Sequence, residues 1–120
     1  MTGDQALREL LGVSEDIVGA LILDSEGEPV AATVTDDEAR RAAGIARAML
    51  AHAEALRTEG VLRRLEAATP DGSLFVVREE ARAVIAATGP DPIAGLVYHD
   101  LRACLRKLHG RARERAHAAA

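Results

Sequence analysis

The stretch Asp24-Ser25-Glu26-Gly27 places two carboxylates and a hydroxyl beside a glycine, a combination that could hold a divalent cation. An EF-hand loop needs alternating oxygen ligands and a distal glutamate, and the stretch has neither. Short apolar runs precede and follow it, which is typical of the turn in a β-hairpin. We therefore interpret Asp24 and Glu26 as solvated turn residues.

The other residues that could do chemistry are scattered along the chain. The four histidines are His52, His99, His109 and His117. His99 directly precedes Asp100 in a predicted helix, where sequence neighbours point apart, so surface positions are the better interpretation. The single cysteine, Cys104, falls on the predicted buried side of that helix and is interpreted as a core residue. We predict no catalytic residue and no metal site, and hence that the protein is not an enzyme.

Composition excludes several classes of protein. The 120 residues suffice for one domain, and their net charge of −4 disfavours binding to nucleic acid. Phe75 and Tyr98 are the only aromatic residues, which leaves almost nothing to stack on bases. Neither a P-loop nor a dinucleotide-binding glycine pattern occurs, so no cofactor is predicted. One cysteine and no apolar run of about 20 residues indicate a cytoplasmic protein without membrane insertion.

Apolar periodicity and turn residues predict an α+β domain. A first helix over residues 4–11, ended by Gly12, is expected to pack as a lid. Thr35 and Glu38 form a capping box that opens a long central helix to about residue 57, with Gly60 as its stop. The predicted strands cover residues 17–23, 29–34, 61–68, 73–78 and 82–88. Short connections between them predict a mainly antiparallel sheet with helices packed against it.

A last helix is predicted to begin with Asp91 as N-cap and Pro92 in the first turn. Its predicted buried side consists of Ile93, Val97, Leu101, Cys104, Leu105 and Leu108. Beyond Gly110 the apolar periodicity ends. We expect one domain over residues 1–109, followed by a frayed basic, alanine-rich tail over residues 110–120.

The central helix has two predicted faces. The side expected to lie on the sheet consists of Ala42, Ile45, Ala46, Met49, Ala53 and Leu56. The opposite side carries a stripe of small residues, Gly44, Ala48, Ala51 and Ala55. This stripe either reflects the high helix propensity of alanine or meets a partner helix, most simply that of a second copy. Arg40, Arg47 and Glu54 would then flank the contact.

The strand over residues 61–68 places Arg63 and Arg64 on opposite faces, which is rare in the middle of a sheet and indicates an edge. A charged edge either protects a monomer or pairs with another chain.

The order of these elements resembles the Roadblock family of dynein light-chain-like proteins, particularly its bacterial members. The similarity covers about residues 7–108 and includes a strand that ends in D-x-x-G before Pro-Val-Ala. The stretches that carry it are VGALILDSEGEPVAA, IARAMLAHAEAL, GVLRRLEAATPDGSLFVV and ARAVIAATGPDPIAGLVYHDLRACLRKL. The resemblance implies a profilin-like sandwich, with a five-stranded antiparallel sheet, the long helix on one face and the terminal helices on the other.

The resemblance also implies dimers joined through the central helix and the third strand, and a non-enzymatic protein that binds and regulates a small Ras-like GTPase or acts as an adaptor. We therefore expect a homodimer. Its expected interface residues are Gly44, Arg47, Ala48, Ala51, Ala55, Arg63 and Leu65. The alternative hypothesis is a small-molecule sensory module with a PAS-like pocket, which the shortage of aromatic residues disfavours.

Overall fold

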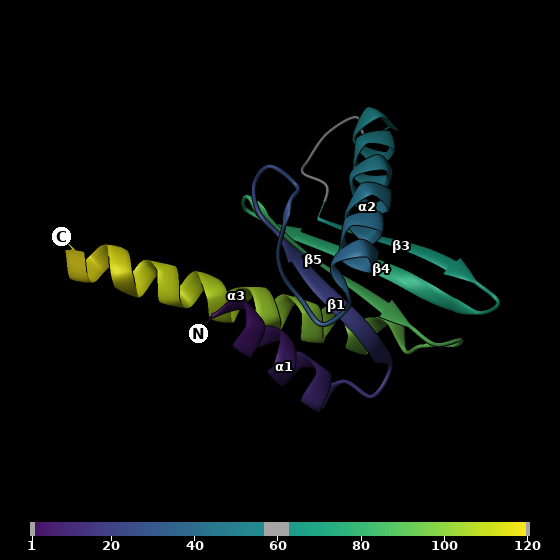
Figure 1. Cartoon of the computed structure of the whole chain (residues 1–120), viewed down its shortest axis with the longest axis horizontal. Coiled ribbons are helices and arrows are strands. Elements are labelled where there is room, and N and C mark those ends of the chain that lie inside the picture. The colour runs from purple at the N-terminus through teal and green to yellow at the C-terminus, as the bar shows by residue number, and fades with distance from the viewer. Residues whose placement is uncertain (1, 57–62, 120) are drawn as a thin grey trace.

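The structure is a computed structural model that describes residues 2–56 and 63–119, with side chains described as far as residue 108. The described part contains three helices and five strands (Figure 1). They are α1 (Gly3–Val13), β1 (Ile17–Leu23), β2 (Pro29–Ala32), α2 (Asp36–Leu56), β3 (Arg64–Thr69), β4 (Gly72–Glu79), β5 (Arg82–Thr88) and α3 (Ala94–Ala119). The predicted α+β class and element order are confirmed. Gly60 and the first residues of the predicted third strand lie outside the described residues.

The strands form one sheet in the order β2-β1-β5-β4-β3, and every neighbouring pair is antiparallel. Helix α2 covers one face, and α1 and α3 lie side by side on the other (Figure 1). Alternate residues of each strand therefore enter two cores. Phe75, Val77 and Val84 face α1 and α3, whereas Val76 and Ile85 face α2. β3 is paired only with β4, so it forms an edge of the described sheet.

The capping box predicted before the central helix is confirmed. The Glu38 amide donates to Thr35 Oγ1 at 3.2 Å, and the Thr35 amide donates to Glu38 Oε2 at 3.4 Å. An equivalent box, formed by Thr2 and Gln5, opens α1. These bonds satisfy amides that have no partner within the helix, and so they fix where each helix begins.

The prediction for the start of the last helix is wrong. Asp91 adopts a left-handed φ of 54°, and α3 begins only at Ala94. An N-cap residue normally has an extended backbone, and the left-handed φ of Asp91 does not fit that position. The Ile93 amide donates instead to Asp16 Oδ2 at 3.2 Å, and the Ile93 side chain is 62% exposed, not buried. The remaining residues of the predicted buried side are buried, from Val97 to Leu108.

Helix α3 continues through Gly110 to Ala119, where the sequence led us to expect a frayed tail. Its last part extends beyond the sheet and away from the other helices (Figure 1). In the described side chains, Leu108 is the last residue of α3 that belongs to the core.

The acidic stretch from Asp24 to Gly27 is a turn between β1 and β2, as predicted. Asp24 Oδ1 accepts hydrogen bonds from the amides of Glu26 at 2.9 Å and Glu28 at 3.0 Å, so the carboxylate folds the loop around itself. Gly27 has a φ of 81°, which favours glycine.

Candidate protein interface on α2 and β3

The sheet-facing side of α2 is built mainly from alanine. Ala39, Ala43 and Ala46 are buried, and Ala42, Met49 and Leu50 pack beside them against the sheet. Small side chains allow the helix axis to lie close to the strands. The buried stripe is therefore centred on alanine and not on the larger apolar residues.

Two residues of α2 predicted to face the sheet do not. Ile45 is 49% exposed and Leu56 is 83% exposed, so this part of the prediction is wrong. Full burial of a large apolar side chain stabilises a fold by about 1.5–3 kcal/mol. Ile45 and Leu56 are exposed, so neither contributes that full amount to the stability of this domain. Both side chains are available to a partner.

The predicted stripe of small residues does lie away from the sheet. Ala48, Ala51 and Ala55 are exposed, and Gly44 is half-buried. Ile45 lies beside this stripe, so the outer surface of α2 combines small and large apolar residues. We call Gly44, Ile45, Ala48, Ala55 and Leu56 the α2 face.

Strand β3 is exposed on both of its faces, apart from half-buried Leu65. Leu65 and Leu74 pack at the margin of the core beneath α2. Leu65 of the edge strand thus faces the side of the sheet that α2 covers.

The two arginines at the start of β3 have different surroundings. The Arg64 guanidinium lies 5.0 Å from the ring centroid of Tyr98, on the side of the sheet that α3 covers. Arg63 lines a cleft of ≈ 460 Å³ together with Arg78, Glu79 and Glu80, and its carbonyl accepts a hydrogen bond from the Arg78 amide. The predicted placement on opposite faces agrees with these contacts.

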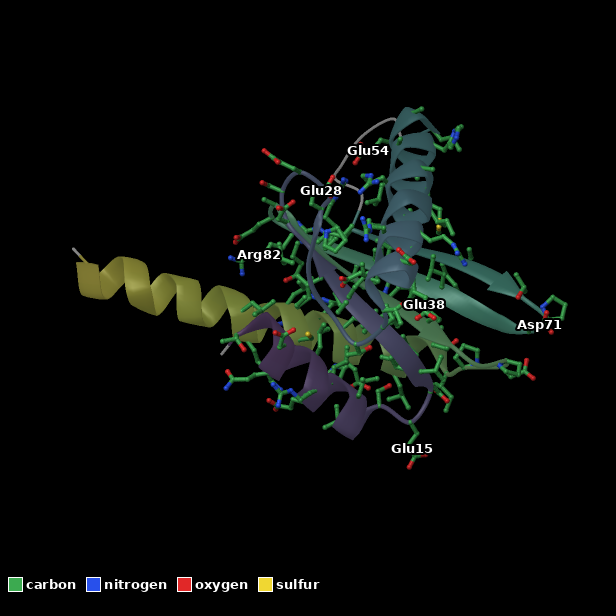
Figure 2. The ribbon with its side chains drawn as sticks, in the orientation of Figure 1. Glu15, Glu28, Glu38, Glu54, Asp71 and Arg82 are labelled. Atoms are coloured by element: carbon green, nitrogen blue, oxygen red, sulfur yellow. The ribbon has the colours of Figure 1, made fainter. Side chains whose placement is uncertain are left out.

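Two charged residues expected to flank the interface make contacts within the chain. Arg47 Nη1 donates to the Gly27 carbonyl at 2.5 Å and lies 3.9 Å from Glu28, which ties α2 to the β1–β2 turn. Glu54 forms an ion pair with Arg78 of β4. Figure 2 shows Glu54 near the upper end of α2. Both contacts orient α2 on the sheet.

Sequence reasoning missed Ile45 and Leu56 as candidate interface residues. The spacing Ala39-Ala43-Ala46-Leu50 was a usable signal, because it marks a narrow helix face that packs closely on a sheet and leaves Ile45 on the outside.

The described residues contain neither an activated cysteine nor a group of side chains that could hold a metal ion. Burial raises the pKa of the Cys104 thiol to about 11, so the reactive thiolate is suppressed at neutral pH. Among the described side chains, no group of three or more His, Cys, Asp or Glu could hold a metal ion. Of the helices described, none has the length and apolar content that crossing a bilayer requires.

The layered arrangement defines a profilin-like domain. Profilin IA of Acanthamoeba castellanii superimposes with a TM-score of 0.63 at 13% identity, covering 92% of this chain and 99% of profilin. Within that class, the chain belongs to the Roadblock/LC7 domain family, whose model matches residues 3–88.

Two solved structures of this family illustrate the similarity. A Roadblock/LC7 domain from Streptomyces avermitilis has a TM-score of 0.77 at 14% identity, with 92% of this chain and 97% of that chain covered. An MglB structure with a tetrameric arrangement has a TM-score of 0.70 at 20% identity, with 93% and 88% covered. No curated protein sequence matches the chain.

Proposed function

We propose that the protein is a homodimeric, non-enzymatic regulator or scaffold that binds a small Ras-like GTPase. The sequence resemblance to the family implies this role, and membership of the Roadblock/LC7 family and the structural likeness to MglB support it. One MglB structure has a tetrameric arrangement, which supports self-association here.

Two observations carry the proposed dimer: Ile45 and Leu56 are exposed on α2, and β3 is an edge strand of the described sheet. Two copies related by a two-fold axis would pack their α2 faces against each other, with Ala48 and Ala55 allowing close approach of the helices. The edges of β3 would pair and extend the sheet across both copies.

The dimer is tested by light scattering of the purified chain and of two alanine variants. Ala48→Glu places a charge at the centre of the α2 face and is expected to produce a monomer. Ala81→Glu places the same charge at another exposed alanine, in the turn between β4 and β5, and is expected to remain a dimer. A monomeric wild-type chain, or an Ala48→Glu variant that still dimerises, contradicts the proposed interface.

The GTPase partner requires a separate measurement. The rate of GTP hydrolysis by a Ras-like GTPase from the same source is measured with and without the protein, together with direct binding to the GDP-bound and GTP-bound forms. Binding that prefers one nucleotide state supports the proposal. A dimer that binds neither state of any such GTPase contradicts the GTPase role and leaves the self-association result unchanged.

A further inference from the structure

The α1–β1 and β5–α3 connections meet at one end of the sheet. Asp16 Oδ2 accepts a hydrogen bond from the Ile93 amide at 3.2 Å, across 77 positions of sequence. Ile17, the next residue, is paired with Thr88 at the end of β5. This end of the molecule is therefore held together by backbone pairing and by a side-chain bond.

Exposed apolar side chains concentrate at this end. Of the seven large apolar side chains exposed in the described residues, four lie here: Val13 (65%), Val18 (71%), Ile93 (62%) and Leu96 (56%). The Leu96 amide donates to the Ile93 carbonyl at 3.0 Å, so both residues belong to the same first turn of α3. We call Val13, Ile93 and Leu96 the end surface.

The end surface exists because α1 covers only part of α3. The two helices run in opposite directions side by side (Figure 1), and Lys107 of α3 forms an ion pair with Glu9 of α1. Leu96 precedes Lys107 by about 16 Å of helix, whereas α1 ends only about 6 Å beyond Glu9, at Val13. The first turns of α3 thus extend past the end of α1 and keep an apolar side uncovered.

The surroundings of the end surface are acidic. Residues 12–18 and 89–100 contain Glu15, Asp16, Asp91 and Asp100 but no lysine or arginine. Glu15 projects away from the body of the domain at the α1–β1 connection (Figure 2). Negative charge around apolar side chains repels nucleic acid and anionic lipid, and it attracts a cationic protein segment.

We infer that the end surface binds a basic amphipathic helix of a partner protein. The apolar side of that helix would cover Ile93 and Leu96 in the space beyond the end of α1, and its lysine or arginine side chains would face Glu15, Asp91 and Asp100. Helix-in-groove recognition of this kind uses a few apolar anchors for affinity and the charged rim for orientation. The end surface shares no residue with the α2 face, so this inference is independent of the proposed dimer interface.

The test uses the full chain, labelled for NMR, and two synthetic helical peptides with the same leucine spacing. One peptide carries lysine at its polar positions and the other carries glutamate. We expect the lysine peptide to bind saturably, to shift the methyl signals of Val13, Ile93 and Leu96, and to weaken as salt is added. We expect the glutamate peptide not to bind.

Variants locate the site. Leu96→Gln removes an exposed apolar anchor without adding a charge and is expected to weaken the lysine peptide at least about tenfold, as loss of an anchor in a hot spot does. Val30→Gln makes the same type of change at an exposed residue of β2, outside both the end surface and the α2 face, and is expected to leave peptide affinity unchanged. Equal thermal midpoints of wild type and Leu96→Gln show that the variant is folded.

Three results overturn the inference: shifts that map to α2 and β3, shifts that spread over the acidic surface without saturating, or unchanged affinity in a folded Leu96→Gln variant. Self-association that Leu96→Gln abolishes and Ile45→Gln does not would also overturn it, because a second copy would then occupy the end surface.

Discussion

The ring of Tyr98 meets the ring of Phe75 edge to face, with centroids 5.1 Å apart and an interplanar angle of 81°. These are the only two aromatic residues of the sequence. Phe75 is fully buried on β4, and Tyr98 carries the guanidinium of Arg64 on its ring at 5.0 Å. Arg64 of β3, Tyr98 of α3 and Phe75 of β4 therefore form one contiguous contact that fixes the edge strand to the helix beneath it.

Removing the Tyr98 ring is expected to destabilise the domain. Tyr98→Ala should lower the free energy of unfolding by about 2–4 kcal/mol, because it removes apolar contact with Phe75 and the cation–π contact with Arg64. Tyr98→Phe retains the ring and should stay within about 1 kcal/mol of wild type. Urea denaturation followed by circular dichroism measures both. Equal losses in the two variants would show that the hydroxyl, and not the ring, is the stabilising group.

Stability is expected to fall in alkaline solution because of Cys104. Burial raises the pKa of this thiol from 9.0 to about 11, so the folded chain retains the thiol proton at pH values where the unfolded chain has lost it. Between these two pH values the folded state binds more protons than the unfolded state. The contribution of the thiol to the free energy of unfolding is therefore fully present below pH 9 and is lost as the pH rises toward 11.

A shift of this size corresponds to about 2–3 kcal/mol over that interval. Cys104→Ala removes the titrating group and should show a shallower fall in unfolding free energy across the same range, although it is less stable at neutral pH. Tyr98, whose pKa burial also raises, contributes in the same direction and is unchanged in this variant. A fall of the same size in wild type and Cys104→Ala would exclude the thiol as its source.

Local sequence signals sufficed for the strands and failed where a distant residue decides the geometry. The strands Ile17–Leu23 and Arg82–Thr88 were predicted to the residue, because each is an apolar run with turn residues at its ends. The start of α3 was wrong because Asp16, far away in sequence, bonds the Ile93 amide. The orientation of α2 was wrong at Ile45 because the helical spacing was centred on Ile45 and Met49, while Ala39, Ala43 and Ala46 form the packed side.

The interface was likewise predictable only in part. The small stripe on α2 and the edge position of β3 followed from residue type and spacing. The role of Arg47 did not, since nothing local to α2 shows that its guanidinium reaches the Gly27 carbonyl.

The contact between Gly27 and Arg47 leads to a further prediction. A Cβ at Gly27 would lie 2.7 Å from Arg47 Cδ, and the φ of 81° disfavours any residue with a side chain. Gly27→Ala should therefore lower the free energy of unfolding by about 1–2 kcal/mol.

Gly12→Ala is the matched control, because a Cβ at this position of α1 has open space, and alanine should stabilise the helix by up to about 1 kcal/mol. Thermal unfolding of the two variants should shift in opposite directions, and a neutral Gly27→Ala would contradict the argument.

The turn between β4 and β5 offers a stabilising substitution. Glu79 pairs with Arg82, which leaves Glu80 and Ala81 as a two-residue turn, and Glu80 has a φ of 55°. Such hairpins favour glycine at the first turn position, where a side chain costs about 1 kcal/mol of backbone strain. Glu80→Gly should raise the free energy of unfolding by about 0.5 kcal/mol, since the greater freedom of glycine in the unfolded chain offsets part of that strain.

Ala81→Gly is the matched control. Ala81 is not among the described residues with positive φ, so glycine at this position brings only the entropic cost and should destabilise the domain. Denaturant midpoints of the two variants measure these effects, and a loss of stability in both would show that the Glu80 side chain contributes more than the relief of backbone strain.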